Sequence, residues 1–296
     1  MNSKTIFSFF SGCGILDLGF ENAGFDIKFV NEYSIDFLRA YQYSRAKMGM
    51  KAPEYGYANV DINVFLNDRK AELKKYISIE HKLGNDVGFI GGPPCPDFSV
   101  AGKNRGASGE NGKLSLSYIN LIVRHEPDFF LFENVKGLLT HDHGRTYKTI
   151  VNIFESTGYV IQKQVLNAWD YGVAQKRERL ITVGIRNDLA DKIHFNFPTP
   201  HKYKPVLRDI LLDCPKSDGA PYSSYKKRIF EQVPPGGYWR DIPEETAKEY
   251  MKSCWYMEGG RTGILRRLSL DEPSLTVLTS PSQKQTDRCH PIEARP

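Results

Sequence analysis

The sequence predicts an α/β protein built on a mostly parallel, doubly wound sheet. Three observations favour this fold class. Short apolar runs, rich in β-branched and aromatic residues, recur along roughly the first 186 residues. Longer helical stretches separate these runs, and several of the runs end in glycine-containing or polar turns. Strands and helices that alternate in this way favour a parallel sheet with helices on both faces.

The predicted strands are apolar for most of their length, which is typical of strands buried in a sheet. In chain order they cover residues 4–10, 25–31, 86–90, 128–134, 159–167 and 179–185. The predicted helices between them cover residues 34–48, 69–83, 115–126 and 147–158. We find no internal repeat and no low-complexity tract.

The amino-acid composition and the periodicity of the sequence change after about residue 187. This change predicts two domains, residues 1–186 and 187–296. Segments such as PTPHKYKP and VPPGGYWRDIP are rich in proline, glycine and aromatic residues and show little periodicity. Trp239, Trp255, Ile264 and Leu265 indicate that this second part packs a core of its own. We therefore expect a smaller, irregular lobe, with a disordered linker as the alternative.

Composition is that of an ordinary globular protein, with 40% hydrophobic and 25% charged residues. A net charge of +5 permits a polyanionic partner without requiring one. No apolar run approaches the roughly 20 residues that a membrane-spanning helix needs, and the start lacks the pattern of a secretory signal. The five cysteines are scattered and odd in number, which suits a reducing cytoplasm and argues against disulfides or structural zinc. We expect no metal.

The segment GGPPCPDFS places a cysteine, Cys95, directly after a stiff turn at the end of the strand 86–90. Gly91 and Gly92 permit unusual backbone angles, while Pro93 and Pro94 each fix one dihedral. Loops at strand ends of open α/β sheets carry much of their chemistry. A buried structural cysteine is the alternative, and for an isolated cysteine it is the commoner case.

The first strand runs into the turn FFSGCGILDLGF, residues 9–20. Gly12 and Gly14 match the start of a dinucleotide fingerprint, but Asp17 stands where its third glycine belongs. Glu32 follows the second strand at the separation from which such folds bind a ribose. A nucleoside-type ligand without a pyrophosphate fits this turn, and S-adenosylmethionine is one. The alternative is that the glycines serve only close packing.

Two further segments bring charged side chains to strand ends. FLFENV delivers Glu133 to the end of a buried strand, where a carboxylate is costly unless it is paired or functional. QKRERL supplies Gln175, Arg177 and Arg179 on alternate positions, so both guanidinium groups can face one way. The alternatives are a glutamate that pairs with an arginine or caps a helix, and an exposed charged edge strand.

Together these segments resemble the motifs of the cytosine-5 DNA methyltransferases. FFSGCGILDLGF, GGPPCPDFS, FENV and QKRERLITVG occur in that family's order and approximate spacing, over roughly the first 185 residues. The segment 266–281 is similar, more loosely, to the family's target-recognition region. The resemblance implies the Rossmann-like fold of S-adenosylmethionine-dependent methyltransferases in residues 1–186 and a target-recognition lobe in residues 187–296.

The resemblance also implies a cofactor, S-adenosylmethionine. Phe10 would pack on its adenine beside Tyr33, and Glu32 would bind the ribose hydroxyls. The cofactor residues that the resemblance implies are Phe10, Gly12, Cys13, Gly14, Glu32, Tyr33, Asp61, Ile62, Pro94 and Leu114.

The reaction that the resemblance implies begins with attack of the Cys95 thiolate on carbon 6 of cytosine. Glu133 would hydrogen-bond or protonate ring nitrogen 3, and Arg179 would bind the cytosine carbonyl with the support of Arg177. The cytosine must be flipped out of double-stranded DNA to reach them. Ser99 and Gln175 are the expected DNA contacts. A bacterial restriction-modification system is the family-level expectation.

The sequence departs from the family pattern at Ile15, Pro96 and Ser115, none of which supplies a group that the reaction requires. It stops at RCHPIEARP, before the closing motifs of the family. We therefore expect a fragment of a longer polypeptide, with a second polypeptide that supplies the missing motifs as the alternative. On either interpretation the isolated chain is expected to be weakly active or inactive.

Three other functions compete with this interpretation. A tRNA cytosine-5 methyltransferase would carry a Cys-Phe-Thr signature, which we do not find. An inactive DNA-binding or regulatory relative would not need Cys95, Glu133 and both arginines. An NAD-dependent oxidoreductase would leave those same residues unexplained.

Overall fold

The computed structural model describes residues 4–94, 110–211, 221–258, 261–277 and 288–296. By its internal contacts the chain divides into two compact units. The first comprises residues 1–166 and 178–197, and the second comprises residues 167–177 and 198–296. This division differs from the predicted boundary after residue 186 in two segments. Residues 167–177 belong with the second unit because β7 (Gln175–Lys176) pairs with β10 (Ser274–Leu275).

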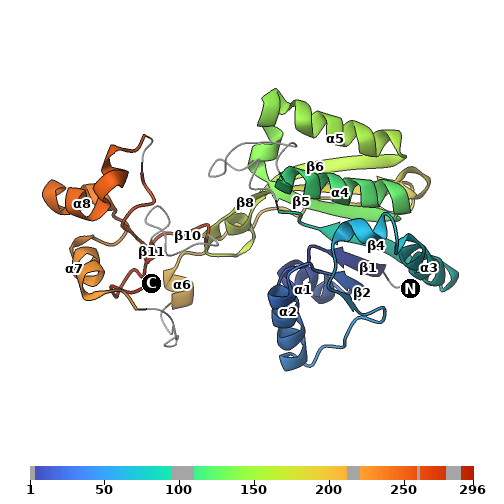
Figure 1. Cartoon of the computed structure of the whole chain (residues 1–296), viewed down its shortest axis with the longest axis horizontal. Helices are drawn as coiled ribbons and strands as arrows, with labels where there is room; N and C mark the ends of the chain where they lie inside the picture. The colour runs from blue at the N-terminus through green and yellow to red at the C-terminus, as the bar shows by residue number, and fades with distance from the viewer. Residues whose placement is uncertain (1–3, 95–109, 212–220, 259–260, 278–287) are drawn as a thin grey trace. The chain divides into compact units, whose positions relative to one another are not determined.

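The first unit is built on a seven-stranded sheet of order β3-β2-β1-β4-β5-β8-β6 (Figure 1). Strands β1, β2, β3, β4 and β5 pair in parallel, whereas β8 is antiparallel to β5. The mostly parallel sheet that the sequence predicts is therefore confirmed. The strands are β1 (Lys4–Phe9), β2 (Asp26–Asn31), β3 (Tyr57–Ala58), β4 (Asp86–Gly91), β5 (Phe129–Val135), β6 (Tyr159–Asn167) and β8 (Glu178–Arg186).

Helices cover both faces of this sheet (Figure 1). Because side chains alternate along a strand, Phe7 and Phe9 face one side and Ile6 faces the other. The phenylalanine face packs against α3, α4 and α5, and the Ile6 face packs against α1 and α2. The helices are α1 (Ile15–Asn22), α2 (Ile35–Lys47), α3 (Lys70–Lys82), α4 (Glu110–His125) and α5 (Arg145–Ser156), with short 3₁₀ turns at Ile62–Phe65, Lys136–Leu139, His141–Gly144 and Asn187–Leu189.

The predicted elements agree with these bounds to within a few residues, with two omissions. Helix α1 was not predicted, because its eight residues directly follow the first glycine turn and were interpreted as part of a ligand-binding turn. Strand β3 has only two residues, too few for a pattern. The sequence also gave no indication that β8 runs antiparallel to β5, because the direction of a strand depends on the strand beside which it lies and not on its own residues.

The second unit has its own core beneath short elements. Phe230, Trp239, Ile264 and Leu265 are buried in one cluster, and Trp255 packs against it, as the sequence predicts for a packed lobe. Its helices are α6 (Arg208–Leu211), α7 (Ser224–Gln232) and α8 (Glu244–Met251), with 3₁₀ turns at Ala168–Tyr171, Trp239–Asp241 and Lys252–Tyr256. Its strands pair as β7 with β10 and as β9 (Arg266–Arg267) with β11 (Arg288–Cys289).

Candidate functional site

One edge of the large sheet collects the side chains that the sequence singles out in the first unit. Strands β1, β2, β4 and β5 run parallel, so their carboxyl ends meet at this edge. Strand β8 is antiparallel to β5, so its first residues lie at the same edge, with Val135 opposite Arg179. Ligands of open α/β sheets bind at this edge as a rule.

The turn after β1 is held open by residues in the left-handed region of backbone angles. Phe10, Gly12 and Gly14 have φ values of 52°, 55° and 84°. A Cβ atom at Gly14 would lie 2.5 Å from the Tyr41 ring, so glycine is required there for packing as well as for backbone conformation. A Cβ at Gly12 would meet nothing within 4 Å. Gly12 therefore borders open space that a ligand can enter.

Glu32 follows β2 and joins this turn. Its Oε2 accepts a hydrogen bond from Gly12 N at 2.8 Å, and its Oε1 accepts one from Ser34 N at 2.7 Å. The residue is only 9% exposed, yet each carboxylate oxygen retains a second lone pair. Tyr33, the next residue, is 74% exposed. The arrangement offers two fixed acceptors and an aromatic ring beside open space.

The segment after β3 contacts the residues that follow β2. Asn59 Nδ2 donates to the carbonyl oxygens of Glu32 and Tyr33 at 2.9 and 2.7 Å. Asp61 is exposed and caps a 3₁₀ turn by accepting from Asn63 N at 2.7 Å, whereas Ile62 is buried. The predicted Asp61 therefore lies two positions along the chain from Asn59, whose side chain binds the carbonyl oxygen of Glu32.

The remaining predicted cofactor residues differ in their exposure. Cys13 is an exposed free thiol in the first turn. Pro94 is exposed after β4, and Leu114 is half-buried on α4. Ile15 is 78% exposed and Ser115 is buried.

A buried polar network beneath the first turn escaped the sequence-based prediction. Asp17, which breaks the dinucleotide fingerprint, is fully buried and accepts from Ser8 Oγ at 2.7 Å and Tyr41 OH at 2.9 Å. Arg45 Nη2 donates to Gly14 O at 2.9 Å. Burial raises the pKa of Asp17 above its usual range, although these hydrogen bonds and Arg45 oppose the rise. The available signal was an acidic residue between two leucines at the start of a helix.

The other half of the site is an ion pair between adjacent strands. Arg179 Nε lies 2.9 Å from Glu133 Oε1, and both side chains are 24% exposed. A Cβ at Gly92 would lie 2.9 Å from Glu133 Oε2, so the missing side chain of Gly92 makes room for this carboxylate. Lys136 and Glu178 form a neighbouring, exposed pair at 3.0 Å. The structure therefore brings Glu133 and Arg179 together in an ion pair, and a glutamate paired with an arginine was one of the alternatives that the sequence left open.

The other predicted residues lie elsewhere or outside the description. Cys95 and Ser99 fall outside the described residues. Arg177 and Gln175 belong to the second unit, where Arg177 N donates to Asn167 Oδ1 at 3.0 Å and Gln175 lies opposite Ser274.

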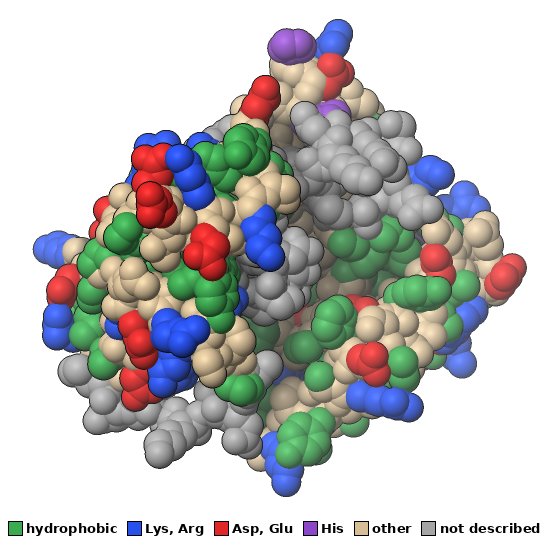
Figure 2. Space-filling view, turned by 60° about the vertical axis from the view of Figure 1, so that its left-hand side comes forward, with side chains coloured by type: hydrophobic (Ala, Val, Ile, Leu, Met, Phe, Trp, Pro, Cys, Tyr) green, Lys and Arg blue, Asp and Glu red, His purple; other side chains and the backbone are tan. Residues whose placement is uncertain are grey.

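Neither the distribution of charge nor the metal-binding side chains of the described residues indicate a further site. On the face in Figure 2, lysine and arginine side chains are interspersed with aspartate and glutamate. Across the described ranges, no group of three His, Cys, Asp or Glu side chains could hold a metal ion. No described helix is long and apolar enough to cross a bilayer.

Known proteins similar to this chain are DNA methyltransferases. Residues 4–295 match the family model described as C-5 cytosine-specific DNA methylase. Over 293 residues the chain is 41% identical to the type II methyltransferase M.Sau96I of Staphylococcus aureus, which covers 98% of this chain and 64% of that protein. It is 40% identical over 303 residues to M.Eco47II of Escherichia coli, which covers 100% of this chain and 68% of that protein. The chain thus spans about two thirds of the length of these relatives.

Solved structures agree on the fold. A protein encoded within an E. coli prophage matches with a TM-score of 0.65 and 21% identity, over 99% of this chain and 85% of that one. A DNMT2 mutant from Spodoptera frugiperda matches with a TM-score of 0.53 and 18% identity, over 78% of this chain and 66% of that one. At such identities the likeness concerns the fold alone, and the predicted α/β class is confirmed.

Proposed function

Because this chain belongs to the C-5 cytosine-specific DNA methylase family, we propose that it transfers a methyl group from S-adenosylmethionine to carbon 5 of a flipped-out cytosine in duplex DNA. The observation that carries the proposal is the pair formed by Glu133 and Arg179 at the carboxyl edge of the sheet, 2.9 Å apart. Two relatives named type II methyltransferases support a place as the modification enzyme of a restriction-modification system.

The pair fits one edge of a cytosine. Ring nitrogen 3 and the carbonyl oxygen are attached to the same ring carbon, so groups that bind them must lie side by side. Glu133 can donate a proton or hydrogen bond to nitrogen 3, while Arg179, always charged, donates to the carbonyl oxygen. Both contacts withdraw electrons from the ring and favour attack on carbon 6.

The residues of the first turn fit S-adenosylmethionine. Gly12 borders open space, and the Glu32 carboxylate beside it can accept hydrogen bonds from a pair of ribose hydroxyls. Tyr33 and Phe10 offer aromatic surface for an adenine, and Asp61 offers an exposed carboxylate. When bound, the cofactor supplies an electrophilic methyl group.

Cys95 is the nucleophile in this proposal, assigned from the family motif because it lies outside the described residues. Its thiolate forms a bond to carbon 6, which turns carbon 5 into a nucleophile. After methylation a base removes the proton from carbon 5, and the sulfur leaves carbon 6. Flipping the cytosine out of the duplex costs a few kcal/mol.

A trapping experiment tests the proposal without knowledge of the target sequence. The chain is incubated with S-adenosylmethionine and a long duplex in which 5-fluorocytosine replaces cytosine. Fluorine on carbon 5 cannot leave as a proton does, so we expect a covalent protein–DNA complex that survives denaturing electrophoresis. Cys95→Ala should abolish it. Equal trapping by Cys95→Ala, or equal trapping on RNA of the same sequence, would contradict the proposal.

A further inference from the structure

Helix α2 places two buried polar side chains beneath the turn that follows β1. Tyr41 is 1% exposed and Arg45 is 3% exposed. They lie four positions apart and therefore share one face of the helix. Polar groups are costly to bury without partners, so the contacts of these two side chains indicate what the helix does for the turn. Neither residue is among those assigned to the cofactor above.

Arg45 binds both ends of α1. Its Nη2 donates to the carbonyl oxygen of Gly14 at 2.9 Å and lies 2.7 Å from Glu21 Oε2. Gly14 closes the turn as the N-cap of α1, and Glu21 lies in the last turn of that helix. The Glu21 carboxylate thus compensates the buried charge of Arg45 while the guanidinium holds the carbonyl of the turn. The Tyr41 ring fixes its position further, since the ring centroid lies 4.6 Å from the guanidinium carbon.

A chain of hydroxyl groups joins Tyr41 to the turn itself. Tyr41 OH donates to Asp17 Oδ2 at 2.9 Å, and Ser8 Oγ donates to Asp17 Oδ1 at 2.7 Å. Ser8 Oγ also lies 2.8 Å from the hydroxyl of Ser11, a residue of the turn. A hydroxyl carries one hydrogen, so Ser8, which gives its own to Asp17, accepts from Ser11. Asp17 is therefore the common acceptor that connects the turn to α2.

The turn needs such support because its backbone is strained. Phe10 has a φ of 52°, in the left-handed region that residues other than glycine rarely adopt. A conformation of this kind persists only where the surrounding contacts over-determine it. Gly12 and Gly14, with φ values of 55° and 84°, could adopt other angles as readily. Loss of the contacts from α2 would therefore let the turn sample shapes that do not fit a ligand.

We propose that Tyr41 and Arg45 are positioning residues of the cofactor site. They hold the turn in its binding shape before S-adenosylmethionine arrives, so the cofactor does not have to order it. The apparent affinity of a ligand falls with the fraction of protein in the competent conformation, so weaker support of the turn means weaker binding. The identity of the cofactor rests on the proposed function, whereas the support of the turn does not.

Two variants test the proposal. Tyr41→Phe removes the hydroxyl that donates to Asp17 and keeps the ring that packs on Gly14. Arg45→Met removes the donor to Gly14 and the partner of Glu21 but keeps an unbranched side chain. Calorimetric titration with S-adenosylmethionine should show binding weakened about threefold by Tyr41→Phe and about tenfold by Arg45→Met, because the second variant loses a charged donor.

Hydrogen exchange of the turn amides, measured without cofactor, tests the support directly. Gly12 N donates to Glu32 Oε2 at 2.8 Å and Gly14 N donates to Ser11 O at 2.9 Å, so both amides exchange only when the turn opens. Both should exchange about three- to tenfold faster in the variants. This readout decides the support of the turn even where S-adenosylmethionine binding, and with it the proposed function, fails.

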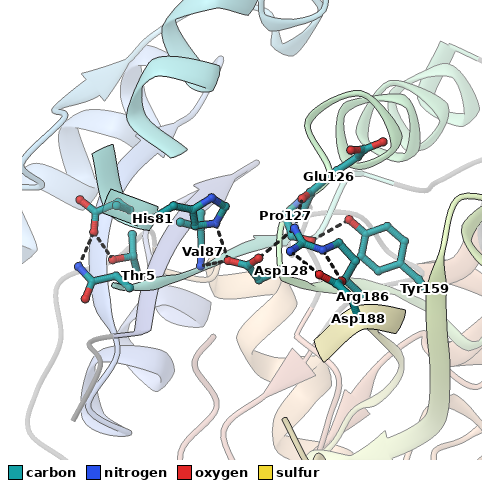
Figure 3. A network of polar contacts seen from close by, with 11 residues as sticks. Thr5, His81, Val87, Glu126, Pro127, Asp128, Tyr159, Arg186 and Asp188 are labelled. Atoms are coloured by element: carbon teal, nitrogen blue, oxygen red, sulfur yellow. Dashed lines mark hydrogen bonds and ion pairs between the residues drawn. The ribbon is translucent and has the colours of Figure 1, made fainter. Parts of the chain in front are cut away.

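The matched control for Tyr41→Phe lies at the opposite edge of the same sheet, where β5 begins (Figure 3). Tyr159 is 2% exposed, and its hydroxyl donates to the carbonyl oxygen of Pro127 at 2.8 Å. Tyr159→Phe should also lower the thermal stability, but it should leave the affinity for S-adenosylmethionine and the exchange of the turn unchanged. For Arg45→Met the control is Arg39→Met, at an exposed position of the same helix.

Turn amides that exchange at the wild-type rate in both variants would overturn the proposal, as would faster exchange with unchanged affinity. Equal losses of affinity in Tyr41→Phe and Tyr159→Phe would show that the two hydroxyls act only through overall stability, and would overturn it too. If Arg45→Met does not fold, Tyr41→Phe, which lacks a single oxygen atom, decides.

Discussion

Glu133 and Arg179, 46 positions apart in the chain, meet at 2.9 Å because β5 and β8 pair in antiparallel register. Val135 is the partner of Arg179 in this register, and Glu133 is the partner of Ile181. A shift of one residue would turn Arg179 to the opposite face of the sheet and break the pair. The strand pairing, rather than any local motif, therefore holds the two groups together.

Glu133→Gln and Arg179→Lys should each lower methyl transfer by about 10²–10³-fold, the usual effect of losing one proton donor or one charge-stabilising group. The glutamine cannot supply a proton, and the lysine lacks the planar fork that contacts the carboxylate. Turnover with radiolabelled S-adenosylmethionine measures the effect.

Glu178→Gln is the matched control, because Glu178 lies beside this pair but binds the exposed Lys136 instead. An exposed ion pair contributes little, so turnover should stay within about twofold of the wild type. If Glu178→Gln and Glu133→Gln reduced turnover equally, the reactive role of Glu133 would have to be abandoned.

Gly92→Ala should reduce turnover about tenfold with little change in thermal stability. The new Cβ would lie 2.9 Å from Glu133 Oε2, and the flexible carboxylate must move away from its position. Small displacements of a reacting group lower rates strongly. Gly19→Ala is the control: a Cβ there meets nothing within 4 Å, and alanine should stabilise α1 by about 0.5–1 kcal/mol. Undiminished turnover in Gly92→Ala would show that the close approach of Gly92 to the Glu133 carboxylate has no role in the reaction.

Much of this fold could be read from the sequence because strands buried on both faces leave long apolar runs. Strand β1 is predicted at 4–10 and observed at 4–9, strand β4 is predicted at 86–90 and observed at 86–91, and α2 and α3 differ from prediction by one residue at each end. An arginine partner for Glu133 was among the alternatives that the sequence left open, but the sequence did not indicate that this partner would be Arg179.

What the sequence could not give depends on contacts between distant residues. Asp17 was interpreted as a missing glycine, whereas its role as a buried acceptor requires Ser8 and Tyr41, which only the folded sheet brings to it. The space that Gly92 leaves for Glu133 is likewise a property of two adjacent strands.

Glu32→Gln should raise the KM for S-adenosylmethionine about ten- to hundredfold and change kcat less. An amide in place of the carboxylate cannot accept from both Gly12 N and Ser34 N, and hydrogen bonds to a charged group are worth about 1.5–3 kcal/mol. Asp36→Asn, in the exposed first turn of α2, is the control and should leave KM unchanged. A drop confined to kcat would argue against a cofactor role for Glu32.

Glu80→Gln should destabilise the first unit in a way that disappears in acid. Glu80 is fully buried; burial alone would raise its pKa, but hydrogen bonds from Tyr55, Thr5, Asn85 and Lys28 lower it to about 2. Since this lies below the ordinary 4.5, the ionised carboxylate stabilises the fold above about pH 4.5, and that contribution is lost as pH falls through about 2.

The shift corresponds to about 3 kcal/mol at neutral pH. Urea denaturation should therefore show Glu80→Gln less stable than the wild type by about that amount at pH 7, with a difference that shrinks steadily between pH 4.5 and 2. Glu54→Gln is the matched control, since Glu54 contacts the same Lys28 at 3.1 Å but is 58% exposed, and it should cost well under 1 kcal/mol. A difference between wild type and Glu80→Gln that stayed constant down to pH 2 would mean that the ionised form of Glu80 does not stabilise the fold.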